Sequence, residues 1–161
     1  MKIRKATENE MLALWEYESL EGATPTAQFF YKNIKSGNAD FWTLDDEGRL
    51  LGELYIFYNL EDKDFANGKD RAYLCAFRIE KELRGQGLGT NLIKSVMKEI
   101  KAQGYRTVTI GVDETEEANI SLYHRLGFQR KIKDCYRDPC ARDNDMEPKP
   151  CSCFWLLSKD L

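Results

Sequence analysis

The spacing of hydrophobic residues changes along the chain between the two-residue period of strands and the longer period of helices. Residues 72–79 are mostly apolar and rich in aromatic and aliphatic side chains, which predicts a strand. Residues 91–100 carry apolar side chains at helical spacing, which predicts an amphipathic helix. The apolar positions of this helix are Leu92, Ile93, Val96, Met97 and Ile100.

A glycine-rich loop, Arg-Gly-Gln-Gly-Leu-Gly-Thr, joins the predicted strand and helix at residues 84–90. The first N–H groups of a helix have no partner within it, and the helix dipole favours negative charge at that end. Glycine lets the backbone approach a bulky phosphate, and Arg84 adds a permanent positive charge. The loop is therefore predicted to bind a phosphate-containing ligand.

The N-terminal third is predicted to form a strand and two helices. Residues 2–6 alternate between polar and apolar side chains, as a strand does. A capping box at Thr7 and Glu10 begins the first helix, which we expect to end at Gly22. The second helix is predicted over residues 24–37, with a Thr-Pro start and a glycine stop.

The remaining strands follow from apolar runs and turns. Residues 41–44 and 50–58 flank the turn Asp-Asp-Glu-Gly-Arg, which predicts a β-hairpin. Residues 107–112 are β-branched and follow the amphipathic helix, so we expect a strand parallel to residues 72–79 with a right-handed crossover. Strand-like residues 129–136 and 152–157 come last, with a proline-containing polar loop predicted between them.

Length and charge narrow the class of protein. The 161 residues predict a single domain over residues 1–161. The net charge of -3 shows no broad basic excess, which argues against a dedicated nucleic-acid binder. No apolar run approaches membrane-spanning length, and the first residues lack the apolar core of a signal peptide. We therefore expect a soluble, cytoplasmic protein with no nucleic-acid or membrane partner.

Two motifs carry a resemblance to a known family. The loop lacks the glycine at position 90 of a dinucleotide fingerprint and the G-K-[ST] of a Walker loop. It matches [RQ]-x-x-G-x-[GA] through Arg84, Gly87 and Gly89, and residues 119–128 add Leu-Tyr followed by Gly-Phe. The pair, in this order and separation, resembles the GNAT superfamily of acetyl-CoA-dependent N-acetyltransferases.

The resemblance implies a fold and a co-substrate. The fold is α/β, with a mixed, mostly antiparallel central sheet, helices on both faces and a parallel pairing at the coenzyme site. Acetyl-CoA is the implied co-substrate, and no metal is expected. The implied coenzyme-binding residues are the main chain of Phe77, Arg78 and Ile79 with the loop residues Arg84, Gly85, Gln86, Gly87, Leu88, Gly89 and Thr90.

The resemblance also implies a reaction, the direct attack of a primary amine on the coenzyme thioester in a ternary complex. Tyr123, in Leu-Tyr…Gly-Phe, is the implied general acid for the leaving thiolate, with core packing as the alternative role. Some family members carry a glutamate where Tyr73 stands here, so Glu53 on the neighbouring strand is the candidate base. The alternative for Glu53 is an exposed strand carboxylate. Asn119 is the candidate contact to the pantetheine, although the usual asparagine position holds Glu116.

Several alternatives remain open at this stage. A non-catalytic acyl-CoA-binding or sensing module would keep the loop and lose turnover, and a nucleotide-phosphate binder is disfavoured by Thr90. The acceptor is a small-molecule or peptide amine, and both a monomer and a homodimer are open. The acidic residues Glu16, Glu18 and Glu21 are either a wall for a cationic acceptor or a solvated face.

Cysteines gather in the C-terminal segment. An odd total of five, in a chain with no export signal, argues against a disulfide framework. The C-terminal spacings differ from the paired C-x2-C of structural zinc sites. We expect reduced thiols that line or flank the acceptor side at Cys135, Cys140, Cys151 and Cys153.

Overall fold

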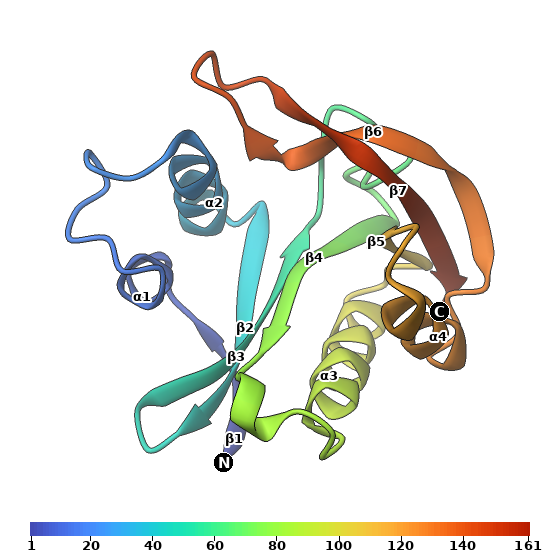
Figure 1. Ribbon diagram of the computed structural model, residues 1–161, viewed down its shortest axis with the longest axis horizontal. Coiled ribbons are helices and arrows are strands. Elements are labelled where there is room, and N and C mark those ends of the chain that lie inside the picture. The colour runs from blue at the N-terminus through green and yellow to red at the C-terminus, as the bar shows by residue number, and fades with distance from the viewer.

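A seven-stranded sheet organises the fold of the computed structural model, which describes residues 1–161 (Figure 1). Its strand order is β1-β2-β3-β4-β5-β7-β6. None of the helices is both long enough and apolar enough to cross a membrane. The elements in chain order are β1 (Lys2–Ala6), α1 (Glu8–Leu14), α2 (Pro25–Ser36), β2 (Ala39–Asp46), β3 (Arg49–Phe57), β4 (Arg71–Ile79), the short 3-10 helix η1 (Lys81–Leu83), α3 (Leu88–Ala102), β5 (Thr107–Asp113), α4 (Glu117–Arg125), β6 (Arg130–Arg142) and β7 (Pro148–Asp160).

The sheet is mixed and mostly antiparallel, as predicted. Only β4 and β5 are parallel, and they pair over Arg71–Leu74 and Thr107–Ile110. Helix α3 connects these two strands, which is the crossover expected for a strand-helix-strand unit. The glycine-rich loop at the start of α3 follows the opposite, C-terminal end of β4, beyond the residues that pair with β5.

Helices cover both faces of the sheet, and each face has its own hydrophobic core. Helices α3 and α4 pack on one face, and α1 and α2 pack on the opposite face (Figure 1). Neighbouring positions on β3 contribute to different cores, because Leu54 belongs to the α3 side and Tyr55 to the α1–α2 side. This explains why the sequence of β3 is apolar at nearly every position.

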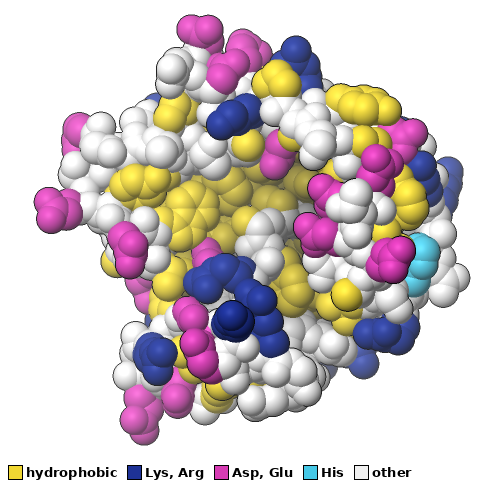
Figure 2. Space-filling model, viewed as in Figure 1, with side chains coloured by type: hydrophobic (Ala, Val, Ile, Leu, Met, Phe, Trp, Pro, Cys, Tyr) yellow, Lys and Arg dark blue, Asp and Glu magenta, His cyan; other side chains and the backbone are white.

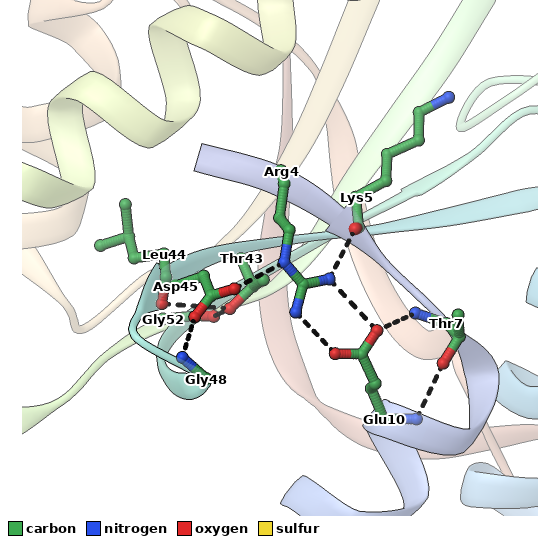
Figure 3. Close-up of polar contacts among 9 residues, drawn as sticks. All are labelled: Arg4, Lys5, Thr7, Glu10, Thr43, Leu44, Asp45, Gly48 and Gly52. Atoms are coloured by element: carbon green, nitrogen blue, oxygen red, sulfur yellow. Dashed lines mark hydrogen bonds and ion pairs between the residues drawn. The ribbon is translucent and has the colours of Figure 1, made fainter. Parts of the chain in front are cut away.

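The N-terminal elements are tied to the first hairpin by polar contacts (Figure 3). The Thr7 hydroxyl accepts the Glu10 N–H at 3.1 Å, and the Glu10 carboxylate accepts the Thr7 N–H at 3.0 Å, which confirms the predicted capping box. Arg4 donates to both Glu10 oxygens at 3.2 and 2.7 Å, and to Asp45 at 2.8 Å. One guanidinium thus joins β1, α1 and the end of β2.

The first helix is shorter than predicted. It ends at Leu14 instead of Gly22, and Glu16 has a left-handed φ of 64°. The Tyr17 N–H donates to the Leu12 carbonyl at 2.9 Å, which closes the helix end. The apolar residues beyond it still pack on the α1–α2 core, because the Trp15 ring contacts Phe30 with 5.1 Å between centroids. The apolar residues that follow α1 are therefore explained by packing against this core and not by a longer helix.

The C-terminal strands are longer than predicted. The polar stretch between residues 136 and 152 is mostly strand, and β6 and β7 pair from Arg130–Ser158 to Arg142–Pro148 with three register shifts. Pro139 lies on β6, which is the edge strand of the sheet. Pro148 and Pro150 lie on β7 before Phe154, where pairing with β5 begins. Proline is compatible with strands at such edge positions because no inner neighbour needs its missing N–H.

Strand β4 is irregular where its pairing with β5 has ended. The pairing of β4 with β3 shifts register, so that Glu53 faces Arg78 and Tyr55 faces Cys75. This leaves one extra residue on β4, and Ala76 there has a left-handed φ of 52°. From residue 75 onward β4 has no partner on its β5 side. We call this unpaired opening, between residues 75–79 and 111–113, the splay.

Candidate active site

The N-terminus of α3 lacks a side-chain cap. Gly87 is the N-cap, and the first bond within the helix runs from the Asn91 N–H to the Gly87 carbonyl at 3.0 Å. The amides of residues 88–90 therefore have no partner within the helix. Helices α1 and α2 differ, because Thr7 and Thr24 cap them through their hydroxyls. The end of α3 is thus available to an external acceptor of hydrogen bonds, and its dipole favours an anion.

The glycines of the loop have two different roles. Gly85 and Gly87 both have a left-handed φ of 81°, and a Cβ at either would meet no atom within 4 Å. They shape the loop and leave open space beside it. A Cβ on Gly89 would instead lie 2.7 Å from the Phe77 ring, so Gly89 lets α3 approach β4. Arg84 donates from Nε to the Ile79 carbonyl at 3.0 Å, which fixes its guanidinium next to the loop.

A cavity of about 630 Å³ lies between β4, the loop and α4, and we call it the loop cavity. Gln86 is exposed and is not part of the lining. Arg125 is part of the lining and was not predicted. Arg125 follows Ala118 and Leu122 on α4 at helical spacing, so these three side chains share one face of the helix. That spacing, within the segment around residues 119–128 that resembles the family, is the sequence signal that could have identified Arg125. The predicted residues that line this cavity are Phe77, Arg78, Ile79, Arg84, Gly85, Gly87, Leu88, Gly89, Thr90 and Asn119.

A second cavity, of about 240 Å³, occupies the splay, and we call it the splay cavity. It shares Phe77 and Asn119 with the loop cavity, so the two meet at these residues. Tyr123 and Glu116 line it from the α4 side. Asn119 donates from Nδ2 to the Glu116 carboxylate. The position usually held by asparagine in the family and its proposed substitute therefore lie side by side.

Tyr123 is both a packing residue and a lining residue. Its side chain is 5% exposed and contacts Phe128 edge to face with 6.3 Å between ring centroids. Burial, and to a lesser extent the charge of Glu116, raises the pKa of Tyr123 to about 12. The phenol is therefore protonated at neutral pH and lies where the splay cavity can reach it.

Glu53 is buried, at 5% exposure, so its alternative role as an exposed strand carboxylate is wrong. Its Oε1 accepts from the Trp15 indole at 2.6 Å and from the Tyr55 hydroxyl at 2.8 Å. Its Oε2 accepts from Arg78 Nε at 2.7 Å. Glu53 lines none of the cavities described here. Its ion-pair partner Arg78 lines the loop cavity, so this ion pair links the buried carboxylate to that cavity. The hydrogen bond from Arg78 to Glu53 raises the pKa of Arg78.

A third cavity, of about 270 Å³, lies between β4, β5 and β7, and we call it the hairpin cavity. It shares Cys75, Ala76, Gly111, Val112 and Asp113 with the splay cavity, so the two adjoin at the opening. The face drawn in Figure 2 is hollowed between α2 and the β6–β7 hairpin, with apolar side chains on its floor. Acidic side chains gather beside this hollow, and basic side chains lie below it.

Of the four C-terminal cysteines, Cys151 lines a cavity and Cys135, Cys140 and Cys153 line none of the three. Cys151 and Cys75 line the hairpin cavity, whereas Cys135 and Cys140 are buried and all five thiols are free. No three His, Cys, Asp or Glu side chains come together as metal ligands. The three acidic residues between α1 and α2 are exposed, line none of these cavities and form no ion pairs, as a solvated face does. These are Glu16, Glu18 and Glu21.

The structure therefore brings an uncapped helix N-terminus, a glycine-rich loop and the splay together around adjoining cavities. The sequence profile of the Acetyltransferase (GNAT) family matches residues 7–128. The chain therefore belongs to the GNAT acetyltransferase family.

Curated relatives are similar over part of their length. The chain is 24% identical over 107 residues to N-acetyltransferase 8 of Rattus norvegicus, which is 66% of this chain and 47% of that protein. It is 37% identical over 67 residues to N-alpha-acetyltransferase 30 of Schizosaccharomyces pombe, which is 42% of this chain and 44% of that protein. The chain thus spans about half the length of the curated relatives it matches.

Solved structures show the same fold over nearly the whole chain. The ribosomal-protein-S18-alanine N-acetyltransferase of Escherichia coli has a TM-score of 0.70 at 18% identity, covering 99% of this chain and 92% of that one. A GNAT family acetyltransferase of Elizabethkingia anophelis with acetyl-CoA bound has a TM-score of 0.66 at 20% identity, covering 99% and 97%. The parallel β4–β5 pair and the sheet therefore have known structural counterparts.

Proposed function

We propose that this protein transfers an acetyl group from acetyl-CoA to a primary amine of a small molecule or peptide, by direct attack in a ternary complex. The observation that carries the proposal is the uncapped N-terminus of α3, which opens on a cavity that adjoins the one that Tyr123 lines. Family membership and the likeness to an acetyl-CoA-bound structure support it.

The loop fits the phosphates of coenzyme A. The free amides of residues 88–90, the two left-handed glycines and the cations Arg84 and Arg125 form one concave, electropositive lining. Gly85 and Gly87 leave the space that a bulky pyrophosphate needs. The loop main chain would hold the pyrophosphate in this proposal, and Asn119 would contact the pantetheine where the two cavities meet.

The irregular part of β4 supplies the donor for the thioester oxygen in this proposal. Negative charge develops on that oxygen as the amine attacks, and a fixed N–H lowers the energy of the charged state. The bulge takes Ala76 and Phe77 out of register with β3, and the β5 side of this segment is unpaired. We assign the donor to the main chain of Phe77, Arg78 or Ile79.

Tyr123 and Glu53 are the proposed acid and base. Tyr123 keeps its proton at neutral pH and would deliver it to the leaving thiolate. Glu53 accepts three hydrogen bonds, and a carboxylate offers about four lone-pair sites, so one site on Oε2 remains for a water leading to the amine. The base role therefore requires a water chain rather than direct contact.

The proposal is tested by measuring thiol release from acetyl-CoA with a panel of amines, together with calorimetry of coenzyme binding. Release that depends on both the amine and Tyr123 supports the transferase. Tight coenzyme binding without release for any small amine or peptide would overturn it and favour the acyl-CoA-binding module. Failure to bind the coenzyme at all would overturn both.

Location and assembly belong to the same proposal. We infer that the protein acts in the cytoplasm as a single domain, without a nucleic-acid or membrane partner, and both a monomer and a homodimer are open. Cell fractionation and sedimentation velocity of the purified chain test these two points independently of turnover.

A further inference from the structure

The hairpin cavity is acidic. Asp113 and Asp138 are its only charged lining residues, and neither forms an ion pair. Asp113 Oδ1 accepts from the Thr115 N–H and hydroxyl at 2.8 and 2.6 Å, and these bonds lower the pKa of Asp113. Asp113 lies at the end of β5 and Asp138 lies on β6, so the two carboxylates reach the cavity from different strands.

Local hydrogen bonds orient Asp138 and leave half of its carboxylate free. Asp138 Oδ1 accepts from the main-chain N–H groups of Cys140 and Ala141 at 2.9 and 3.3 Å. Lys149 stands opposite Asp138 in the β6–β7 register but makes no ion pair with it. The Oδ2 atoms of Asp138 and Asp113 accept no hydrogen bond from the protein. Two fixed carboxylates without a cation are complementary to a positively charged ligand.

Tyr73 gives an independent indication of a ligand. Its side chain is 4% exposed, its hydroxyl makes no hydrogen bond to the protein, and it lines the hairpin cavity. The hydroxyl lies 3.0 Å from the position that a Cβ on Gly111 would take, and Gly111 lines both the hairpin and the splay cavities. The hydroxyl opens on the cavity with no protein partner, so a polar group of a ligand can meet it there.

We propose that the hairpin cavity selects an acceptor with two cationic nitrogens, a small aliphatic diamine or polyamine. This inference rests on the proposed transferase function and names its substrate class. One nitrogen enters the splay past Tyr73 and Gly111 and is acetylated. The second is held as an ammonium group by the free oxygens of Asp138 and Asp113. Cys151 and Phe154 complete the wall around the carbon chain.

The size of the cavity agrees with this class. A volume of about 270 Å³ holds a short aliphatic chain and excludes a folded protein surface. A primary amine with a neutral tail would leave both carboxylates without a counter-charge. A charge-assisted hydrogen bond contributes enough to change affinity about tenfold.

The test compares diaminobutane with aminopentane, which has the same length but one nitrogen. We expect kcat/KM to be about tenfold higher for diaminobutane. Asp138→Asn keeps the oxygen that accepts from Cys140 and Ala141, so folding is preserved. It should raise the KM for diaminobutane about tenfold, with kcat and the constants for aminopentane nearly unchanged.

Asp145→Asn is the matched control, because Asp145 is exposed in the same hairpin and lines none of the cavities. It removes the same charge and should change neither KM. Equal kcat/KM for the two amines, or an equal loss in the Asp138 and Asp145 variants, would overturn the inference.

Calorimetry of diaminobutane with the coenzyme A-loaded protein separates this inference from the proposed function. Binding that weakens about tenfold in Asp138→Asn supports the acidic subsite even if no thiol is released, and in that case only the transferase function fails. Absence of diaminobutane binding to the wild-type protein would overturn the inference, whether or not other amines are acetylated.

Discussion

At the scale of residues, the role of a side chain at this site depends on the groups that surround it. Glu53 illustrates this, because its sequence context places a carboxylate inside a continuous apolar run. That run indicates a strand buried on both faces, but the sequence does not show which donors surround the carboxylate. Tyr55 lies two positions along the same strand, but Trp15 and Arg78 come from other segments, and only the fold brings these two to Glu53.

Tyr123→Phe separates catalysis from packing. The substitution keeps the ring that contacts Phe128 and removes only the proton donor. We expect turnover to fall on the order of a hundredfold, with coenzyme affinity and melting temperature nearly unchanged. Tyr136→Phe is the matched control, because Tyr136 is 63% exposed and lines none of the cavities. Near-normal turnover in the Tyr123 variant would reduce this residue to packing.

The pH dependence of turnover follows from the burial of Tyr123. Its pKa is raised to about 12, so the protonated, donating form persists well into the alkaline range. We expect kcat not to decline between about pH 8 and about pH 10, where an unperturbed tyrosine would begin to lose its proton. Rates measured across this range for the wild type and for Tyr123→Phe test the expectation. A loss of rate centred near pH 10, absent from the variant, would contradict it.

Glu53→Gln tests the base. The amide can still accept from Trp15 and Tyr55, but it cannot take a proton from the amine. We expect a fall in turnover of about a hundredfold or more and a rate-versus-pH curve that loses its dependence on this group. Weaker coenzyme binding with an unchanged curve would instead show that Glu53 only positions Arg78 beside the loop cavity.

At the scale of elements, the sequence predicted the local motifs that begin and end helices and strands, but it did not predict the lengths of α1, β6 and β7. The capping box of α1, the ends of α2 and the strand-loop-helix unit around α3 follow from short-range chemistry. Helix α1 was predicted too long because Trp15 continues the apolar period into a loop. The strands β6 and β7 were predicted too short because prolines and charges usually mark loops, whereas here they lie on an edge strand and beyond the last inner pairing.

Gly87→Glu tests the loop as an anion site. The new side chain would project into the open space beside the free amides and place a carboxylate where phosphate oxygens must approach. We expect calorimetry to show no coenzyme A binding while circular dichroism shows a folded protein. Gly37→Glu is the control, because Gly37 has a similar φ of 84° and empty surroundings but lies at the end of α2. Unchanged affinity in the Gly87 variant would rule out this placement.

At the scale of the molecule, the loop cavity and the hairpin cavity each share lining residues with the splay cavity. The loop cavity lies on the α3–α4 face, and the hairpin cavity lies against β6–β7 near the α1–α2 core. The lining of the loop cavity could be predicted from the sequence because most of it comes from one contiguous motif. The lining of the hairpin cavity could not be predicted, since Tyr73, Asp113 and Asp138 are far apart in sequence and meet only through the strand order.

This arrangement predicts sequential kinetics. The coenzyme and the amine would reach the splay from different cavities, so both can be bound before the acetyl group moves, and no acetylated enzyme is required. Initial rates measured over a grid of acetyl-CoA and amine concentrations should give intersecting reciprocal plots. Parallel plots would contradict direct attack and point to a covalent intermediate. Cys75, which lines both the splay and the hairpin cavities, is the thiol that would carry it. Intact mass after incubation with acetyl-CoA alone, for the wild type and Cys75→Ser, then decides the question, and we expect no added acetyl group in either protein.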